Sequence, residues 1–274
     1  MKIFVISLKQ STARFEQIKT QLNAIGLPFT IIEAIDGDEI DSKKSCIDPF
    51  RFRLSQKRDC RAGEIGCAES HRKAWKEVIK HSDQYSLILE DDAFLPLKID
   101  KFLKTFEETN NIFDIVNLSS MGSYKINNER IQELKNSNDN SRICLKQFST
   151  GWWKVLNYQS FAENIICECN IMPHSMVAYI VTPRACKALL SATKKISYPI
   201  DYAFRHTRGR MRQGFSAPVI ISQNSDNVST IGGRSHKIKL TLFERMRAFC
   251  RKQRAIGRKF DIFMMYRLKG LIKW

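Results

Sequence analysis

The stretch Tyr85–Pro96, YSLILEDDAFLP, decides the fold, because it joins a buried strand to a group of acids. The run SLIL is typical of a strand buried on both faces. It ends in Glu90, Asp91 and Asp92, three carboxylates that would be very costly to bury without partners. A strand that brings them to one point predicts a cation there, and oxygen ligands favour Mg²⁺ or Mn²⁺ together with substrate phosphates.

The geometry of a strand limits how these acids can act. Neighbouring strand residues face opposite sides, so Asp91 and Asp92 reach one ion only if the chain turns after the strand. The alternative is an acidic turn exposed to water. Apolar residues on both sides of the acids favour a position at a cleft.

The composition is that of a globular protein with an unusually basic charge. The chain has 274 residues, of which 43% are hydrophobic, and a formal net charge of +17. No apolar run approaches the roughly 18 residues that cross a bilayer. The N-terminus lacks a small-residue cleavage site and predicts a strand, not a signal peptide. The eight cysteines form no CxxC pair, so we expect a reduced, cytosolic protein without a zinc site.

Strands and helices alternate over the first 120 residues. The predicted elements are a strand at 2–8, a helix from 13 to 25, a strand at 29–34, a helix at 64–81, the strand at 86–89, a helix at 99–108 and a strand at 113–118. Gly26 is a suitable end for the first helix. This alternation predicts an α/β fold with a mostly parallel sheet flanked by helices. A nucleotide-like ligand is expected at the carboxyl ends of its strands.

The second half of the chain is less regular. Residues 176–182 predict a strand, 183–192 a helix that starts with proline, and 218–222 a short final strand. Earlier, residues 40–61 predict a long loop, and the Asn- and Ser-rich residues 122–140 predict a flexible insertion.

Residues 237–274 form a basic tail that we separate from a domain at 1–236. Its twelve Lys and Arg against two acids give +10, more than half of the net charge. Apolar residues recur at near-helical spacing, which is typical of a basic amphipathic helix on an anionic membrane surface. A C-terminal helix packed on the domain is the alternative. No nucleic-acid partner is expected, because no motif for one is present.

In five blocks the chain resembles glycosyltransferase family 25, the bacterial lipooligosaccharide galactosyltransferase-type enzymes. The most specific block is GEIGCAESH at 63–71, followed by Trp75 and by LILEDDA at 87–93. The others are ISLK at 6–9 with Arg14, AIDG at 34–37, Ala178-Tyr179 leading to Pro199-Ile200-Asp201, and Gln223 with Ser229 and Ile231. The chain departs from the family at Ser175-Met176-Val177, where Gly-Thr usually precedes the Ala-Tyr pair.

The resemblance implies a GT-A-like fold, a nucleotide-diphosphate sugar and inversion at the anomeric carbon. We therefore expect a metal-dependent, membrane-peripheral enzyme of the cytoplasmic side of the inner membrane. It would move a hexose, galactose first, from a UDP-sugar to a terminal sugar of lipid-linked lipooligosaccharide or lipopolysaccharide. UDP-glucose and UDP-N-acetylhexosamine are alternative donors. A phosphotransferase or nucleotidyltransferase, and a non-catalytic basic module that binds membranes or polyanions, are the rival hypotheses.

Candidate site residues follow from these patterns. Asp92 is the expected Mn²⁺ or Mg²⁺ ligand, with Asp91 beside it and His236 as a further ligand, and Asp201 is the candidate base or a plain turn residue. The other candidates are Leu8, Lys9 and Arg14 for the donor phosphates, Asp36 and Gly37 for its ribose or base, His71 and Glu90 for the nucleotide or support, and Arg205 and His206 for an anionic acceptor. The alternative for Lys9 and Arg14 is plain surface charge, and for Asp36-Gly37 it is an ordinary turn. The alternative for His71 is a buried histidine whose hydrogen bonds are satisfied within the protein.

Overall fold

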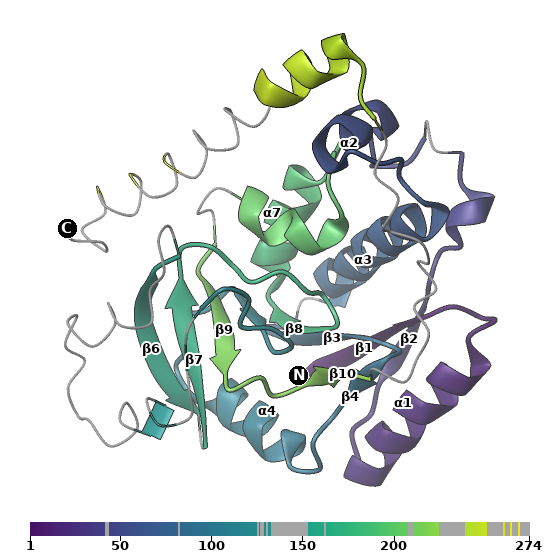
Figure 1. Ribbon diagram of the computed structural model, residues 1–274. Coiled ribbons are helices and arrows are strands. Elements are labelled where there is room, and N and C mark those ends of the chain that lie inside the picture. The colour runs from purple at the N-terminus through teal and green to yellow at the C-terminus, as the bar shows by residue number, and fades with distance from the viewer. Residues whose placement is uncertain are drawn as a thin grey trace.

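An eight-stranded sheet runs through the protein, with helices on both of its faces (Figure 1). The computed structural model describes residues 1–41, 44–81, 83–124, 126, 129, 131–132, 153–161, 163–207, 211–224 and 239–250, with the single residues 260, 264 and 268. The strands are β1 (Lys2–Ser7), β2 (Thr30–Glu33), β3 (Ser86–Glu90), β4 (Ala93–Phe94), β5 (Ile115–Asn117), β6 (Val155–Phe161), β7 (Asn164–Cys169), β8 (Ala178–Val181), β9 (Gln213–Ala217) and β10 (Ser222–Gln223). The helices are α1 (Thr12–Ile25), α2 (Pro49–Gln56), α3 (Ala62–His81), α4 (Ile99–Glu108) and α7 (Pro183–Ala192), with the 3-10 helices η1 (Gly37–Glu39) and η2 (Ile200–His206).

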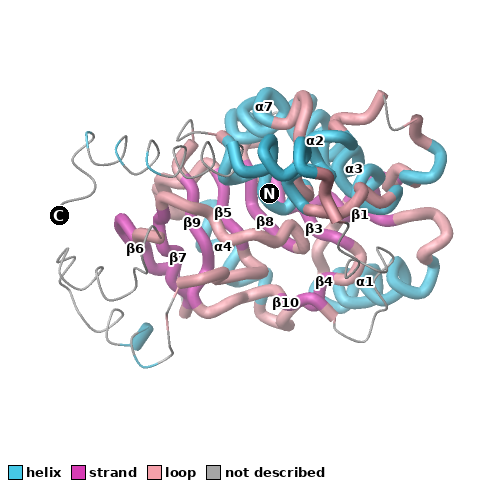
Figure 2. Tube along the Cα trace, turned by 45° about the horizontal axis from the view of Figure 1, so that its top comes forward, coloured by secondary structure: helices cyan, strands magenta, loops and turns pink. Residues whose placement is uncertain are grey.

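The sheet is mixed, so the predicted mostly parallel sheet is wrong. Its strand order is β2-β1-β3-β8-β5-β9-β7-β6, which Figure 2 shows from β1 to β6. Strand β1 is parallel to both β2 and β3, and β5 is parallel to β9. Strand β8 enters antiparallel between β3 and β5, and β7 pairs antiparallel with both β9 and β6. Of the strands in the first 120 residues, β2, β1 and β3 therefore have the expected parallel arrangement, whereas β5 is separated from them by the antiparallel β8.

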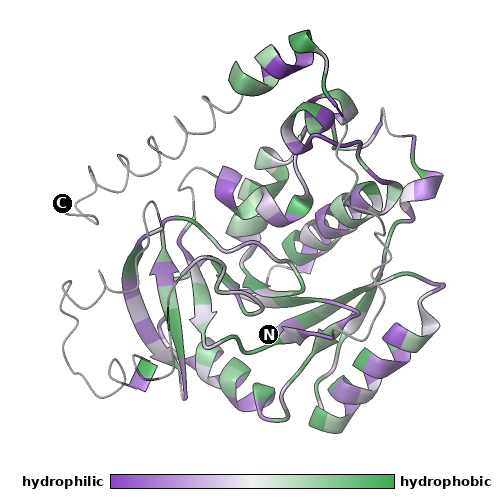
Figure 3. Ribbon diagram, viewed as in Figure 1, coloured by the Kyte–Doolittle hydropathy of each residue, from purple (hydrophilic) through white to green (hydrophobic). Residues whose placement is uncertain are grey.

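Side chains alternate between two cores, one on each face of the sheet. In β1, Phe4 joins the core under α3 and α7, whereas its neighbour Val5 joins the core under α1 and α4. Strands β3 and β8 are accordingly hydrophobic along most of their length, whereas β6 and α1 carry many polar residues (Figure 3). Each fully buried Phe, Leu or Ile contributes roughly 1.5–3 kcal/mol. The two cores hold the sheet rigidly between its helix layers.

Several predicted helices agree closely with the structure. Helix α1 ends at Gly26, whose φ of 76° is the left-handed conformation that glycine adopts without strain. Helices α4 and α7 span the predicted residues, and Thr182 caps α7 by accepting a hydrogen bond from the Ala185 amide at 3.1 Å. Helix α3 begins two residues before its predicted start at Glu64.

Three sequence predictions were wrong. The supposed loop at 40–61 contains α2, which begins after Asp48, the residue that accepts from the Arg51 amide at 2.9 Å. Strands β6 and β7 were not predicted. The final strand lies at 213–217 rather than 218–222, and β10 follows it. Strand β9 has the sequence QGFSA, which shows no strand pattern by itself. Its Gly214 is needed for packing, because a Cβ there would lie 2.7 Å from the Phe113 ring.

The predicted insertion and tail are described only in part. Tyr124 stacks on Phe215 with ring centroids 4.5 Å apart, so the start of the 122–140 segment packs on the core; most of that segment lies outside the described residues. In the tail, residues 242–250 form a helix beside α2, where Glu244 pairs with Arg53 at 3.4 Å. No helix among the described residues is long and apolar enough to cross a membrane.

Candidate active site

A cavity of about 620 Å³ opens at the carboxyl ends of β1, β2 and β3. Parallel strands end at the same edge of a sheet, so the segments that follow these three strands meet there. The first half of α3 and the segments before β8 and at the start of η2 complete the walls. The candidate residues that line the cavity are Leu8, Arg14, Asp36, Gly37, His71, Glu90, Asp91, Asp92 and Asp201. The cavity therefore lies where the strand–helix alternation predicted a ligand.

Asp91 is buried and both of its carboxylate oxygens have partners. The Ser7 hydroxyl donates to Oδ2 at 2.8 Å, and the Arg14 guanidinium lies 3.4 Å from Oδ1. Burial raises the pKa of Asp91, and these two partners oppose that effect by stabilising the ionised form. Both oxygens of this carboxylate are thus paired with other residues of the protein.

Asp92 differs from Asp91 because one of its carboxylate oxygens has no hydrogen-bond partner among the described residues. Gln223 donates to Oδ2 at 2.8 Å, and Arg14 lies 3.9 Å from the same oxygen. Within the described part of the chain, the buried Oδ1 has no hydrogen-bond partner. Burial, followed by the nearby charge of Glu90, raises the pKa of Asp92 to about 6. A buried carboxylate oxygen without a donor is a costly arrangement that a bound cation would relieve.

The donor set fits a divalent cation of the Mg²⁺ or Mn²⁺ type. Such ions take hard oxygen ligands, usually one or two carboxylates with the remaining positions filled by water or phosphate. Asp92 has the unpaired oxygen, Oδ1, and Asp91 is the preceding residue. Asp92 as the direct metal ligand stays a prediction, and His236 lies outside the described residues.

Ser7 and Gln223 were not among the candidate residues. Ser7 ends β1, and Gln223 reaches Asp92 because β10 pairs antiparallel with β4, placing Gln223 opposite Ala93. The backbone amide of Asn224 also donates to the Asp92 carbonyl at 2.8 Å. The appearance of Gln223 in a family-like block was the one sequence signal that could have identified it.

The donor-side candidates separate into two groups. Arg14 faces the aspartates inside the cavity, whereas Lys9 is exposed, pairs with Glu33 at 2.9 Å and does not line the cavity. Asp36 caps η1 by accepting from the Asp38 amide at 3.0 Å, and its other oxygen accepts from Gln10. Asp36 is therefore a turn residue in this structure as well as a lining residue.

Gly37 and Gly66 allow the segment after β2 to lie directly against α3. A Cβ on Gly37 would be 1.7 Å from the Ala62 carbonyl oxygen, and one on Gly66 would be 2.4 Å from the Ile35 carbonyl oxygen. Ser70 of α3 stabilises the contact with this segment, since the Ile35 amide donates to its hydroxyl at 2.8 Å. Backbone packing thus explains the two glycines and fixes this wall of the cavity.

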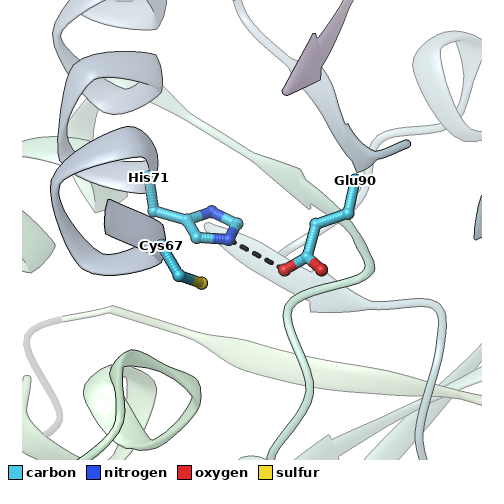
Figure 4. Close-up of side chains that lie close together, drawn as sticks. All are labelled: Cys67, His71 and Glu90. Atoms are coloured by element: carbon cyan, nitrogen blue, oxygen red, sulfur yellow. Dashed lines mark hydrogen bonds and ion pairs between the residues drawn. The ribbon is translucent and has the colours of Figure 1, made fainter. Parts of the chain in front are cut away.

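His71 is fully buried, as one of the two sequence hypotheses held, and it also reaches the cavity. Its Nδ1 lies 3.0 Å from the Tyr179 hydroxyl and its Nε2 lies 3.0 Å from Glu90 Oε1. Figure 4 shows Cys67, one turn earlier on α3, beside this pair. The ligand atoms of Cys67, His71 and Glu90 lie within 4.8 Å of one another, close enough to be considered as a metal site.

On the acceptor side, Asp201 lines the cavity at the start of η2, but Arg205 and His206 do not. Arg205 lies between two aromatic rings, 4.8 Å from the Trp153 centroid and 4.7 Å from the Tyr202 centroid, and burial lowers its pKa. It also lies 3.4 Å from Nδ1 of His174, a residue that does line the cavity. His206 instead stacks on Tyr198 with centroids 3.9 Å apart.

Comparison with known proteins places this cavity in context. Residues 1–204 match the sequence model of glycosyltransferase family 25 (LPS biosynthesis protein). The chain belongs to glycosyltransferase family 25. The matched residues include β1 to β3, α3 and η2 up to Phe204, and so nearly the whole lining of the cavity.

Named relatives share shorter stretches. Procollagen galactosyltransferase 2 of Homo sapiens is 32% identical over 98 residues, which are 34% of this chain and 16% of that protein. A Haemophilus influenzae protein provisionally assigned as a glycosyltransferase is 24% identical over 73% of this chain and 60% of its own length. The chain thus spans about a sixth of the animal relatives it matches.

Family membership alone does not establish an activity. A Bos taurus relative, 29% identical over 34% of this chain, is named as a probable inactive family member. A solved structure of a glycosyltransferase involved in glycosylating the major capsid of PBCV-1 covers 91% of this chain and 100% of its own. Its TM-score is 0.37 at 10% identity.

Proposed function

We propose that this protein is a metal-dependent, inverting glycosyltransferase with a GT-A-like arrangement. It transfers a hexose, galactose first, from a UDP-sugar to a terminal sugar of lipid-linked lipooligosaccharide or lipopolysaccharide. UDP-glucose and UDP-N-acetylhexosamine are the alternative donors. Membership of family 25 supports the class of reaction, and the names of its procollagen galactosyltransferase relatives support galactose.

The open oxygen of Asp92 is the observation that carries this proposal. A structural acid would be expected to have both oxygens satisfied, as Asp91 does. Asp92 lines a cavity large enough for a nucleotide sugar, and its buried Oδ1 has no donor among the residues that the structure describes. A basic module that binds polyanions has no use for such a group.

Asp92 and Asp91 would hold the Mn²⁺ or Mg²⁺ ion. When bound, such an ion stabilises the negative charge that a leaving nucleoside diphosphate gains. Arg14 adds a second, fixed positive charge at the same place, since its guanidinium lies between the two aspartates. Preorganised charge of this kind is usually the largest catalytic contribution.

The other residues of this chain have separable roles in the proposal. Asp201 takes the proton from the attacking acceptor hydroxyl, which an inverting displacement requires. The segment after β2, held against α3 by Gly37 and Gly66, forms the wall for the nucleoside. Arg205 is held by Trp153 and Tyr202 beside His174, where it can attract an anionic group of the acceptor.

The basic tail would attach the enzyme to the anionic inner membrane surface. Within helix 242–250, the side chains of Leu242, Phe243, Met246 and Phe249 are exposed to 62–76% of their area. Phe50 of α2 is 46% exposed, and Arg247 lies 5.9 Å from its ring. Exposed aromatic and aliphatic groups next to Lys and Arg are typical of interfacial helices.

Calorimetric titration with a panel of nucleotide sugars, with and without Mn²⁺, tests the proposal. We expect metal-dependent binding of one UDP-sugar, and loss of that dependence in Asp92→Ala. Absence of binding to every nucleotide sugar would overturn the proposal. Product analysis with the bound donor then separates sugar transfer from transfer of a phosphoryl or nucleotidyl group.

Vesicle sedimentation tests the tail separately. Deletion from residue 240 onward should release the protein from anionic vesicles, and added salt should release the intact chain. Equal binding by the intact and shortened chains, both shown to be folded, would contradict the membrane role. The core activity is expected to survive this deletion on a water-soluble acceptor.

A further inference from the structure

A buried chain of four side chains leads from the core to the cavity. Trp75 Nε1 donates to the Tyr179 hydroxyl at 2.9 Å. The same hydroxyl lies 3.0 Å from His71 Nδ1, and His71 Nε2 lies 3.0 Å from Glu90 Oε1. Trp75, Tyr179 and His71 have no exposed surface, whereas the Glu90 side chain is 25% exposed and lines the cavity.

The indole group of Trp75 sets the donor and the acceptor of every hydrogen bond in this series of four side chains. An indole N–H can only donate, so the Tyr179 oxygen accepts from Trp75. The Tyr179 hydroxyl must then donate its own proton, and among the described residues His71 Nδ1 is its one recorded acceptor. Burial also raises the pKa of Tyr179 well above its usual value, so the phenol keeps that proton.

The tautomer of His71 follows from this direction. If Nδ1 accepts from Tyr179, the ring proton of a neutral imidazole is on Nε2 and is donated to Glu90. A proton on Nδ1 would leave the buried Tyr179 hydroxyl without an acceptor, at a cost of about 1–3 kcal/mol. This cost opposes both the other tautomer and the doubly protonated ring.

The same direction opposes a metal at Cys67, His71 and Glu90. A metal ligand must offer a lone pair, and Nε2 carries a proton in this arrangement. The separation of 3.0 Å between Nε2 and Oε1, drawn as a dashed line in Figure 4, is that of a hydrogen bond. Cys67 lies beside this pair on α3.

We propose that Trp75, Tyr179 and His71 are positioning residues that fix the carboxylate of Glu90 as an acceptor for a hydroxyl group of the sugar-nucleotide donor. The inference rests on the proposed function for the identity of the ligand, but not for the direction of the chain. Glu90 accepts from His71 through Oε1, and within the described residues Oε2 has no recorded partner. A carboxylate held on one oxygen presents the other in a single orientation, which favours one hydroxyl geometry.

The first test is the tautomer itself, in the full-length wild-type protein. Selective ¹⁵N-histidine labelling and long-range ¹H–¹⁵N spectra distinguish a protonated from an unprotonated ring nitrogen. His71→Gln assigns the signal among the five histidines of the chain. We expect Nε2 protonated and Nδ1 unprotonated, unchanged by Zn²⁺. An Nδ1–H form, a doubly protonated ring, or loss of the Nε2 proton on stoichiometric zinc binding would overturn the proposal.

The second test removes one hydroxyl at a time. Tyr179→Phe should weaken binding of the UDP-sugar by about 10- to 100-fold, the usual effect of losing an orienting partner. The matched control is Tyr85→Phe, which removes another buried tyrosine hydroxyl bond, 2.7 Å long, to Asn111 away from the cavity. Equal donor affinities for the two variants, with both folded by thermal melting, would overturn the positioning role.

Glu90→Gln distinguishes the role of Glu90 from that of the side chains that position it. The amide oxygen can still accept from His71, so the Nε2–H signal should persist while the donor binds about tenfold or more weakly. A variant that binds the donor as wild type does would contradict the role of Glu90. If the predicted tautomer is found and no nucleotide sugar binds the wild type, the proposed function and the donor role of Glu90 both fail.

Discussion

Replacing Asp92 with asparagine should stabilise the metal-free protein while it removes metal binding. The change keeps the shape of the side chain, and the amide oxygen can still accept from Gln223. It removes a buried negative charge, one oxygen of which has no donor within the described part of the chain. Active-site groups of this kind commonly cost stability that the ligand restores.

The size of the gain follows from the raised pKa. The carboxyl group of Asp92 has a pKa of about 6 against an ordinary value of 3.8. A difference of about two pKa units corresponds to roughly 3 kcal/mol, which is a ceiling for the cost of the ionised form. That pKa already includes the contact with Arg14 at 3.9 Å, which lowers it. A stabilisation of up to about 3 kcal/mol is therefore expected.

The dependence on pH has a definite sign. Because the folded pKa is above the unfolded one, folding is favoured by the protonated form, and stability is lost as the pH rises through about 6. Urea denaturation with a chelator should therefore show the gain of Asp92→Asn at about pH 8 and little gain near pH 4. Asp100→Asn, in the first turn of α4, is the control. An Asp92→Asn protein that is less stable than wild type at about pH 8 would refute the reasoning.

Three further outcomes are expected. Asp201→Asn should lower kcat about 10²- to 10⁴-fold with nearly unchanged calorimetric affinity for the donor, and a drop below tenfold would return Asp201 to a turn role. Gly37→Ala should destabilise the protein more than Gly26→Ala, because its Cβ would lie 1.7 Å from a backbone oxygen. At Gly26 nothing in the described part of the chain lies within 4 Å of a Cβ, and the cost is the strain of an alanine at a φ of 76°; equal melting temperatures would contradict this. Arg205→Gln should raise KM for an anionic acceptor and leave KM for a neutral one unchanged, and equal shifts for both acceptors would argue against charge recognition.

Local sequence was enough for several elements. Gly26 ends α1, and Pro183 with Thr182 starts α7, because caps and apolar spacing depend on residues within one or two turns. Helix α2 was missed because its sequence, PFRFRLSQ, has no clear apolar stripe: half of its residues are exposed, and the buried ones are Phe52 and Leu54. Its stability comes from tertiary contacts that the periodicity does not record.

The acids at the end of a buried strand, and the position of the cavity beside them, were determined by sequence alone. They follow from one apolar run and one charged triplet, which are properties of neighbouring residues. Only the tertiary structure decided which of these acids keeps an oxygen without a hydrogen-bond partner among the described residues. Ser7 and Arg14 satisfy Asp91 from β1 and α1, and Gln223 reaches Asp92 across 131 positions of the chain.

The mixed sheet and the chain from Trp75 to Glu90 also required the tertiary structure. Strand β8 separates β3 from β5, and it carries Tyr179 to a helix more than 100 residues earlier in the sequence. Such pairings depend on which surfaces the folded chain brings together, and no spacing within a segment encodes them. The chemistry available in this protein is therefore written in its residues, while the partners that orient those residues are set by the fold.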